Sequence, residues 1–223
     1  MTSRPASLRA LLAERRIIAV VRQADAAVAE AMAHAVADGG VRVVEITMGV
    51  PGAASLIARL RGALADDVLV GAGTVLSVCD LEAVLAAGAQ FVVSPGLDRG
   101  LVERCASARV ATLPGVLSPT EAMAARSLGL DAVKLFPADT GGPRHLRALR
   151  AVFPDLAFVP TGGITFDDAA GWFDAGAHAL GLAGEFDAAQ RAGGEAFVRR
   201  LAARMAEAFE TATGDRSTSG AMK

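Results

Sequence analysis

The chain has 223 residues, of which 52% are hydrophobic and 21% are charged, and its formal net charge at pH 7 is −2. This composition is typical of a soluble globular protein with a large core, and the near-neutral charge argues against proteins that bind nucleic acids or anionic membrane surfaces. No apolar stretch has the length of a signal sequence or a membrane span, so we expect a cytoplasmic protein without membrane contacts.

Short β-rich runs recur along the chain, and each is followed by an alanine-rich segment with apolar residues at helical spacing. A helix is expected first, at 6–14, and further helices at segments such as 24–38, 51–64 and 119–128. Asp98, Ser118 with Pro119, and Thr165 are expected at helix starts. Helix ends are expected at Gly39-Gly40, Gly88, Gly129 and Gly176. The predicted strands are 17–22, 42–47, 68–74, 91–95, 111–114, 132–136, 157–161 and 179–182.

Strict alternation of strands and helices predicts a parallel sheet, and eight such units without a linker predict a closed α/β (β/α)8 TIM barrel. The first helix would cap the bottom of this barrel. We expect one domain over 1–211 and a disordered polar tail over 212–223.

Cysteine and histidine give no sign of a metal site. Cys79 and Cys105 lack metal-site spacing, and His34, His145 and His178 are scattered. We therefore expect chemistry without a metal or another cofactor.

Lys134 is unusual because only it and Lys223 are lysines among the 22 lysine and arginine residues. It lies in the apolar run 131–137, on a predicted strand. A desolvated lysine amine can lose its proton and attack a carbonyl group, whereas a guanidinium group stays charged. Lys134 is therefore a candidate Schiff-base nucleophile. The alternative is a strand lysine whose side chain extends to the surface.

Glu45 is a second ionisable residue within an apolar strand. Glu45 and Lys134 lie on the second and sixth predicted strands, and inward residues of alternate strands share a layer of the barrel interior. Two inward side chains would face each other across the lumen, where each makes the burial of the other tolerable. The pair is either a nucleophilic amine with a proton-transferring carboxylate or a buried ion pair without a catalytic role.

Other candidates lie at the carboxyl ends of the strands, where barrel enzymes place their active sites. Thr74 follows two glycines and could bind a carboxylate, and Arg22 could supply the positive charge or form a surface ion pair. Gly162 and Gly163 lie in a region where barrels often bind phosphate, although a Gly-Gly pair is usually only a tight turn.

Seven motifs occur in order along residues 17–184. They are IAVVR at 18–22, GGVRVVEIT at 39–47, VGAGTV at 70–75, VSPG at 93–96, LPGV at 113–116, VKLFP at 133–137 and VPTGGI at 159–164. With these motifs the chain resembles the bacterial 2-keto-3-deoxy-6-phosphogluconate (KDPG) and 2-keto-4-hydroxyglutarate (KHG) aldolase family of class I, Schiff-base lyases.

The resemblance implies a role for each matching residue. Lys134 would form the imine with the keto carbon, and Glu45 would move protons, through a water molecule. The remaining substrate-binding residues would be Arg22, Thr74, Pro95, Phe136, Thr161, Gly162, Gly163 and Gly184. In these roles Thr74 and Thr161 would hold the pyruvyl carboxylate, and the two adjacent glycines would donate N–H groups to a distal phosphate. The family also implies a homotrimer and a place in Entner–Doudoroff carbohydrate metabolism.

The sequence departs from the family pattern at two places. Gly49 stands where many members have a carboxylate-binding arginine, and Arg22 corresponds to the arginine that one branch uses instead. Ala183-Gly184, followed by Glu185, stands where the family usually has Gly-Ser with the serine on the phosphate. This second change leaves an unphosphorylated substrate open.

We therefore expect a metal-independent aldolase that cleaves a 2-keto-3-deoxy acid, first of all KDPG, to pyruvate and glyceraldehyde 3-phosphate. The alternatives are the phosphogalactonate isomer, KHG or an unphosphorylated 2-keto acid. Outside this class, the alternatives are a sugar-phosphate isomerase or synthase on a similar barrel, and a non-catalytic binding protein.

Overall fold

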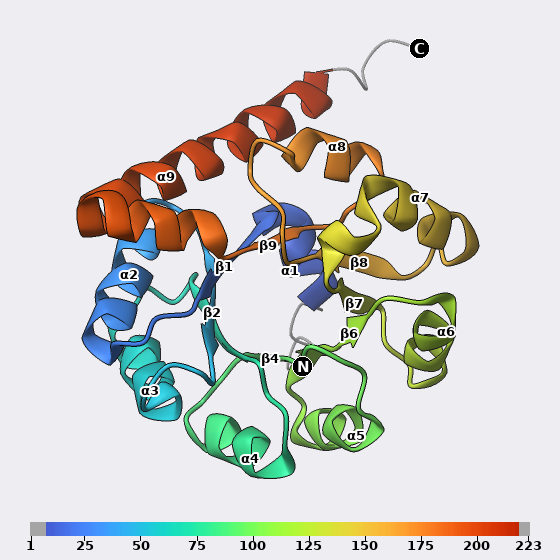
Figure 1. Ribbon diagram of the computed structural model, residues 1–223, viewed down its shortest axis with the longest axis horizontal. Coiled ribbons are helices and arrows are strands. Elements are labelled where there is room, and N and C mark those ends of the chain that lie inside the picture. The colour runs from blue at the N-terminus through green and yellow to red at the C-terminus, as the bar shows by residue number, and fades with distance from the viewer. Residues whose placement is uncertain (1–7, 219–223) are drawn as a thin grey trace.

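The computed structural model of the protein describes residues 8–218. Parallel strands surround the centre of the molecule, and helices form a ring outside them (Figure 1). The strands are β1 (Ile17–Val21), β2 (Val43–Thr47), β3 (Leu69–Gly73), β4 (Phe91–Val93), β5 (Ala111–Leu113), β6 (Gly115–Val116), β7 (Ala132–Leu135), β8 (Ala157–Pro160) and β9 (Leu180–Leu182). All eight predicted strand positions therefore carry strands.

The strands form a six-stranded sheet, in the order β5-β4-β3-β2-β1-β9, and a three-stranded sheet, in the order β6-β7-β8. Strand β5 lies within the predicted fifth strand, 111–114, which ends at Pro114 because proline has no backbone N–H to donate. Strand β6, which follows at Gly115–Val116, was not predicted. Between β8 and β9, Thr161 pairs with Gly181, and the His178 N–H donates to Phe158 O at 2.8 Å. The (β/α)8 barrel expected from the alternation is confirmed.

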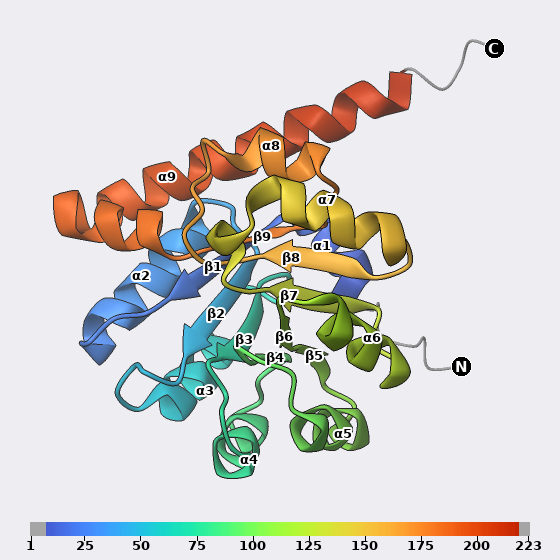
Figure 2. The ribbon, with the colours of Figure 1, turned by 45° about the vertical axis from the view of Figure 1, so that its right-hand side comes forward.

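The helices follow the expected segments. They are α1 (Leu8–Arg15), α2 (Ala26–Asp38), α3 (Ala53–Ala63), α4 (Val78–Ala86), α5 (Arg99–Ala108), α6 (Pro119–Ser127), the short 3₁₀ helix η1 (Ala138–Thr140), α7 (Gly142–Val152), α8 (Ala169–Asp174) and α9 (Gly184–Thr218). Figure 2 shows in a second view that α2 to α9 lie outside the strands, whereas α1 lies at one end of the barrel.

Side-chain caps explain where several helices begin. Asp98 caps α5, and Ser118 forms a reciprocal capping box with Glu121 at the start of α6, as expected. The prediction for Thr165 is wrong, because α8 begins only after Asp168. The Thr165 N–H and hydroxyl instead donate to the Asp168 carboxylate at 3.3 and 2.7 Å, so this segment is a loop.

Helix α1 closes the bottom of the barrel, as predicted. Leu8 and Leu12 are buried in one cluster with inward residues of the strands, such as Ile18, Val43 and Ala132. His178 Nε2 lies 2.7 Å from Arg9 O and fastens the helix to the start of β9. The strands alternate between this inner cluster and a larger outer one, which packs against the surrounding helices.

Gly71 makes room for the largest side chain of the inner cluster. A Cβ atom at this position would lie 2.5 Å from ring atoms of Phe91, which is fully buried on β4. We expect Gly71→Ala to lower the free energy of unfolding by about 1–3 kcal/mol through overpacking. Gly62→Ala is the control, because a Cβ atom there, near the end of α3, meets nothing within 4 Å.

The control change should raise the free energy of unfolding by about 0.5–1 kcal/mol, since alanine is the better helix former. Guanidinium unfolding curves of both variants measure the two effects. Equal midpoints for both variants would contradict this account of the inner packing.

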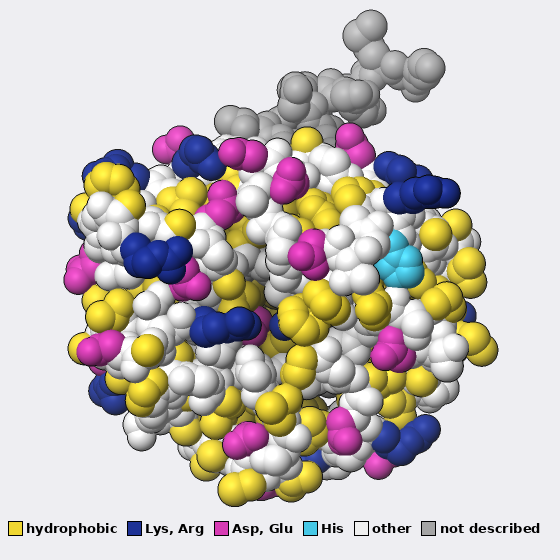
Figure 3. Space-filling view, in the orientation of Figure 1, with side chains coloured by type: hydrophobic (Ala, Val, Ile, Leu, Met, Phe, Trp, Pro, Cys, Tyr) yellow, Lys and Arg dark blue, Asp and Glu magenta, His cyan; other side chains and the backbone are white. Residues whose placement is uncertain are grey.

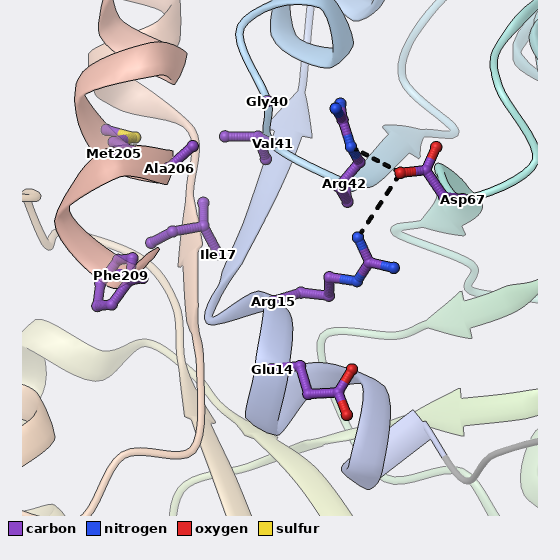
Figure 4. Close-up of a pocket in the computed structure, with 10 residues that line it drawn as sticks. All are labelled: Glu14, Arg15, Ile17, Gly40, Val41, Arg42, Asp67, Met205, Ala206 and Phe209. Atoms are coloured by element: carbon purple, nitrogen blue, oxygen red, sulfur yellow. Dashed lines mark ion pairs between the residues drawn. The ribbon is translucent and has the colours of Figure 1, made fainter. Parts of the chain in front are cut away.

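A pocket of about 370 Å³ lies at the bottom end, among α1, the segments before β2 and β3, and α9 (Figure 4). Arg42 Nε and Arg15 Nη1 lie 2.9 and 3.9 Å from Asp67 Oδ2 within it. These half-exposed ion pairs contribute little to stability. The pocket lies at the opposite end of the strands from the expected site.

Helix α9 is interrupted at Gly193 and Gly194, whose backbone angles are not helical. It continues to Thr218, while residues 219–223 of the predicted tail lie outside the described residues. Disorder over 212–223 therefore stays a prediction. No helix within residues 8–218 has the length and apolarity of a membrane span.

Candidate active site

Glu45 and Lys134 both lie inside the barrel near the carboxyl ends of their strands. Val43 and Ala132, two residues earlier on β2 and β7, belong to the inner cluster, so the alternation of the strands directs Glu45 and Lys134 inward. Their relative exposures are 2% and 5%, which excludes a lysine side chain that extends to the surface. The sequence reasoning placed both groups in this interior.

Gly73 on β3 gives the Glu45 side chain its space. Glu45 pairs in register with Gly71, and a Cβ atom at Gly73 would overlap the Glu45 carboxylate. Glu45 Oε1 is buried and has no hydrogen-bond partner. An unpaired buried oxygen is costly and uncommon in native proteins, and one cause is a catalytic role. The carboxylate is thus held inside the barrel with one oxygen available for a proton or a ligand.

The two buried groups perturb each other's ionisation. Burial raises the pKa of the Glu45 carboxyl, and the positive charges of Lys134 and Arg22 oppose this effect. Burial lowers the pKa of the Lys134 amine; the Glu45 charge opposes that change, and Arg22 adds to it. No direct ion pair within 4 Å joins Glu45 to Lys134 in the described structure. The lowered pKa makes it easier for Lys134 to release its proton and reach the neutral, nucleophilic form of the amine.

The Phe136 ring connects the lysine to the glycine turn after β8. Lys134 Nζ lies 4.7 Å from the centre of this ring. A Cβ atom at Gly162 would lie 3.0 Å from Cε2 of the same ring. Gly162 and Gly163 have φ values of 92° and 67°, which side-chain-bearing residues rarely adopt. The Phe136 ring therefore lies close to both the reactive amine and the turn.

The other predicted site residues also lie at this mouth. Arg22 follows β1, is exposed, and is near enough to influence the ionisation of both buried groups. Thr74 follows β3 with a φ of 57°, a strained conformation for a β-branched residue. Pro95 is half-buried after β4, and its carbonyl group lies against Gly115. Thr161 is buried at the end of β8.

Two further residues at the mouth went unassigned in the sequence reasoning. Gly73 was noticed only as part of a glycine-rich strand end. Asp139 was missed, although it lies in η1 just after the lysine strand, and its carboxylate lies against Gly163. Its position after a strand end was the available signal. Gly184, the first residue of α9, is exposed near this side of the mouth.

The space-filling view shows how the mouth is charged. A hollow lies near the centre of this face, with basic and acidic side chains at its edge and apolar side chains around it (Figure 3). Acidic side chains gather above the hollow, along the segment that joins β8 to α8. The site thus combines a buried amine and carboxylate with a rim that carries both basic and acidic side chains.

Comparison with known proteins bears directly on this site. A family model described as "KDPG and KHG aldolase" matches residues 8–198. The chain belongs to this aldolase family. The family and enzyme class expected from the ordered motifs are therefore confirmed. The isomerases, synthases and binding proteins considered as alternatives lose their support.

Individual members of the aldolase family are similar over most of their length. A 2-dehydro-3-deoxy-phosphogluconate aldolase of Treponema pallidum (strain Nichols) is 42% identical over 70% of this chain and 74% of the relative. A 2-dehydro-3-deoxy-6-phosphogalactonate aldolase of Escherichia coli (strain K12) is 37% identical over 69% of this chain and 76% of the relative.

A solved structure adds a chemical parallel. The crystal structure of a KDPG aldolase from Legionella pneumophila, with pyruvate captured as a covalent carbinolamine intermediate, is 29% identical. It superimposes with a TM-score of 0.82 over 90% of this chain and 98% of the other. A protein of the same fold and family thus forms a carbinolamine with pyruvate.

Proposed function

We propose that the protein is a class I aldolase that reversibly cleaves a 2-keto-3-deoxy acid to pyruvate and an aldehyde. The observation that carries this proposal is a buried lysine amine with a lowered pKa beside a buried carboxylate with an unpaired oxygen. KDPG, which would yield glyceraldehyde 3-phosphate, is the first substrate to test. The phosphogalactonate isomer and KHG are the alternatives, and the names of relatives include both.

The chemistry begins when neutral Lys134 attacks the C2 carbonyl and forms a carbinolamine. Loss of water gives a protonated imine, with Glu45 supplying and accepting the protons. The imine cation accepts the electron pair of the C3–C4 bond when the C4 hydroxyl group loses its proton. Bond cleavage releases the aldehyde and leaves an enamine, which takes a proton at C3. Hydrolysis of the resulting imine releases pyruvate and restores the amine.

The surrounding residues would orient the substrate. Arg22 would pair with the carboxylate at C1, since its guanidinium group lies near both buried groups and is exposed to the mouth. Thr74 and Thr161 would donate hydroxyl groups to the same carboxylate. Pro95 and Phe136 would shape the apolar wall, and the turn at Gly162 and Gly163 would face the distal end. The homotrimer and the cytoplasmic location belong to the same proposal.

Borohydride trapping with pyruvate tests the mechanism. Reduction should convert the imine into a stable secondary amine, which peptide mass spectrometry would locate on Lys134. The assignment is clear because Lys223 is the only other lysine. Borohydride without pyruvate is the control. An adduct on Lys223 or on the α-amino group alone would contradict the proposal, and loss of activity in EDTA would point to a metal-dependent aldolase.

A further inference from the structure

Arg22 is held in place through both of its neighbours in the chain. It follows β1 directly at the mouth, and its own side chain is exposed. Before it, the buried Thr47 hydroxyl group donates to Val21 O at 3.2 Å, which ties the end of β1 to β2. After it, Gln23 Nε2 donates to Asp187 Oδ1 at 2.7 Å. Both neighbours of the arginine are therefore anchored by side-chain hydrogen bonds.

Asp187 comes from the other end of the chain, in the first turn of α9. Strands β1 and β9 are hydrogen-bonded neighbours, with Ala19 opposite Leu182, so the segments that follow them leave the same edge of the barrel. The first turn of α9 is fixed to the core by the fully buried Phe186. The hydrogen bond between Gln23 and Asp187 thus joins the first and last strands beyond the end of their ladder.

The Gln23 side chain is the anchor of an otherwise exposed connection. Of the residues 22–25, which connect β1 to α2, Gln23 alone is half-buried. Its amide nitrogen also lies 3.4 Å from the sulfur of Met32, which is fully buried on α2. A hydrogen bond to a charged acceptor is stronger than one between neutral groups. Loss of this bond would release the backbone next to Arg22 on one side.

The Asp187 carboxylate is half-buried and lies among positive charges. Burial raises the pKa of its carboxyl group, and the charges of Arg191 and Arg22 and the hydrogen bond from Gln23 oppose this change. No ion pair within 4 Å joins Asp187 to Arg22 in the described part of the chain. The direct link between the two elements is therefore the Gln23 amide, and the guanidinium group stays available to a substrate carboxylate.

The position of the arginine backbone matters for binding. A guanidinium group binds a carboxylate through paired hydrogen bonds in a fixed geometry, and small displacements of such a group weaken the binding. We propose that Gln23 and Asp187 are positioning residues, which hold Arg22 where it can bind the carboxylate at C1 of the substrate. This inference rests on the proposed aldolase function. It concerns the affinity for the keto acid and leaves the chemistry at Lys134 unchanged.

Borohydride trapping of pyruvate on Lys134, measured over a range of pyruvate concentrations, tests the inference. Pyruvate carries the carboxylate and the keto group of every candidate substrate, so the result does not depend on the aldehyde. Gln23→Met keeps the length of the side chain but removes the amide donor. The half-saturating pyruvate concentration should rise about three- to tenfold. The maximal trapping rate should change less than about twofold, because Lys134 and Glu45 are intact.

An exchange of the two groups shows whether the hydrogen bond itself matters. Gln23→Glu alone places two carboxylates together and should raise the half-saturating concentration at least as much as Gln23→Met does. When Asp187→Asn is added, the asparagine amide can donate to the glutamate, and the value should return to within about twofold of the unmodified protein. Asp155→Asn is the matched control, because it changes an exposed carboxylate, paired with Arg126, before β8 at the opposite end of the barrel.

Variants of Arg22 separate positioning from a general effect on the fold. Arg22→Met should raise the half-saturating concentration about tenfold or more. In that background Gln23→Met should raise it less than about twofold further, because the group to be positioned is gone. Effects that multiply would overturn the inference. A half-saturating concentration that falls in Asp187→Asn would also overturn it, since the carboxylate would then compete with pyruvate for Arg22.

The outcomes for the inference and for the aldolase proposal are distinct. An adduct on Lys134 with the same half-saturating pyruvate concentration in Gln23→Met, Gln23→Glu and the unmodified protein would overturn the inference alone. Absence of any pyruvate adduct on Lys134 in the unmodified protein would overturn the aldolase proposal and the inference with it.

Discussion

Replacement of Lys134 by arginine is expected to abolish aldol cleavage, with a loss in kcat on the order of 10⁴-fold or more. Arginine keeps the positive charge of the site but cannot release a proton at working pH, so no imine forms. Burial lowers the pKa of the Lys134 amine, so lysine can release its proton at this position, whereas an arginine guanidinium group cannot. The measurement is the rate of pyruvate release, together with the absence of a borohydride adduct.

Two further variants separate chemistry from structure. Lys134→Met removes the charge with a side chain of similar size, and it should be equally inactive but well folded. Lys223→Arg removes the other lysine and should keep full activity. A residual rate within about tenfold of the unmodified protein in Lys134→Arg would show that the reaction does not pass through an imine on this residue.

The strands were readable from the sequence because buried parallel strands form continuous apolar runs between turn residues. The continuation of the fifth strand beyond Pro114 could not be predicted from the sequence. The run 111–114 stops at a proline, and the sequence gives no sign that β6 resumes pairing with β7 at Gly115. The prediction of a helix start at Thr165 was wrong for another reason: side chains that cap helices and side chains that stabilise loops form the same kinds of hydrogen bond.

The candidate site was predictable as far as it depends on position along the strands. Glu45 and Lys134 are ionisable residues in apolar strands, and alternation alone places them inside the barrel. Contacts between different loops were beyond the sequence. The space at Gly73 depends on the register of β2 and β3, and the carboxylate of Asp139 reaches Gly163 from another segment.

Glu45→Gln is the second change with a large expected effect. Glutamine keeps the shape of the side chain but cannot take up or release the protons of carbinolamine formation and cleavage. We expect kcat to fall by about 10²- to 10⁴-fold. The imine with pyruvate should still form slowly, because Lys134 is intact, and borohydride should still trap it. Glu82→Gln, which alters an exposed ion pair with Arg104, is the control and should leave kcat unchanged.

The same variant is expected to be more stable than the unmodified protein at neutral pH. Burial raises the pKa of Glu45 from its ordinary value of 4.5, so the folded protein holds this proton more tightly than the unfolded chain does. The free energy of unfolding therefore falls as the pH rises from 4.5 through the raised pKa. Glutamine has no proton to lose, and this part of the pH dependence should vanish.

The advantage of Glu45→Gln in stability should accordingly shrink as the pH is lowered towards 4.5, because the raised pKa makes the folded protein take up this proton at a higher pH than the unfolded chain does. Urea unfolding at several pH values measures the difference between the two proteins. A difference that instead grows as the pH falls would mean that the Glu45 carboxylate is stabilised in its charged form by Lys134 and Arg22. The two residues would then form a buried ion pair. The neutral amine that the reaction needs would form only when bound substrate changes the protonation of Glu45 and Lys134.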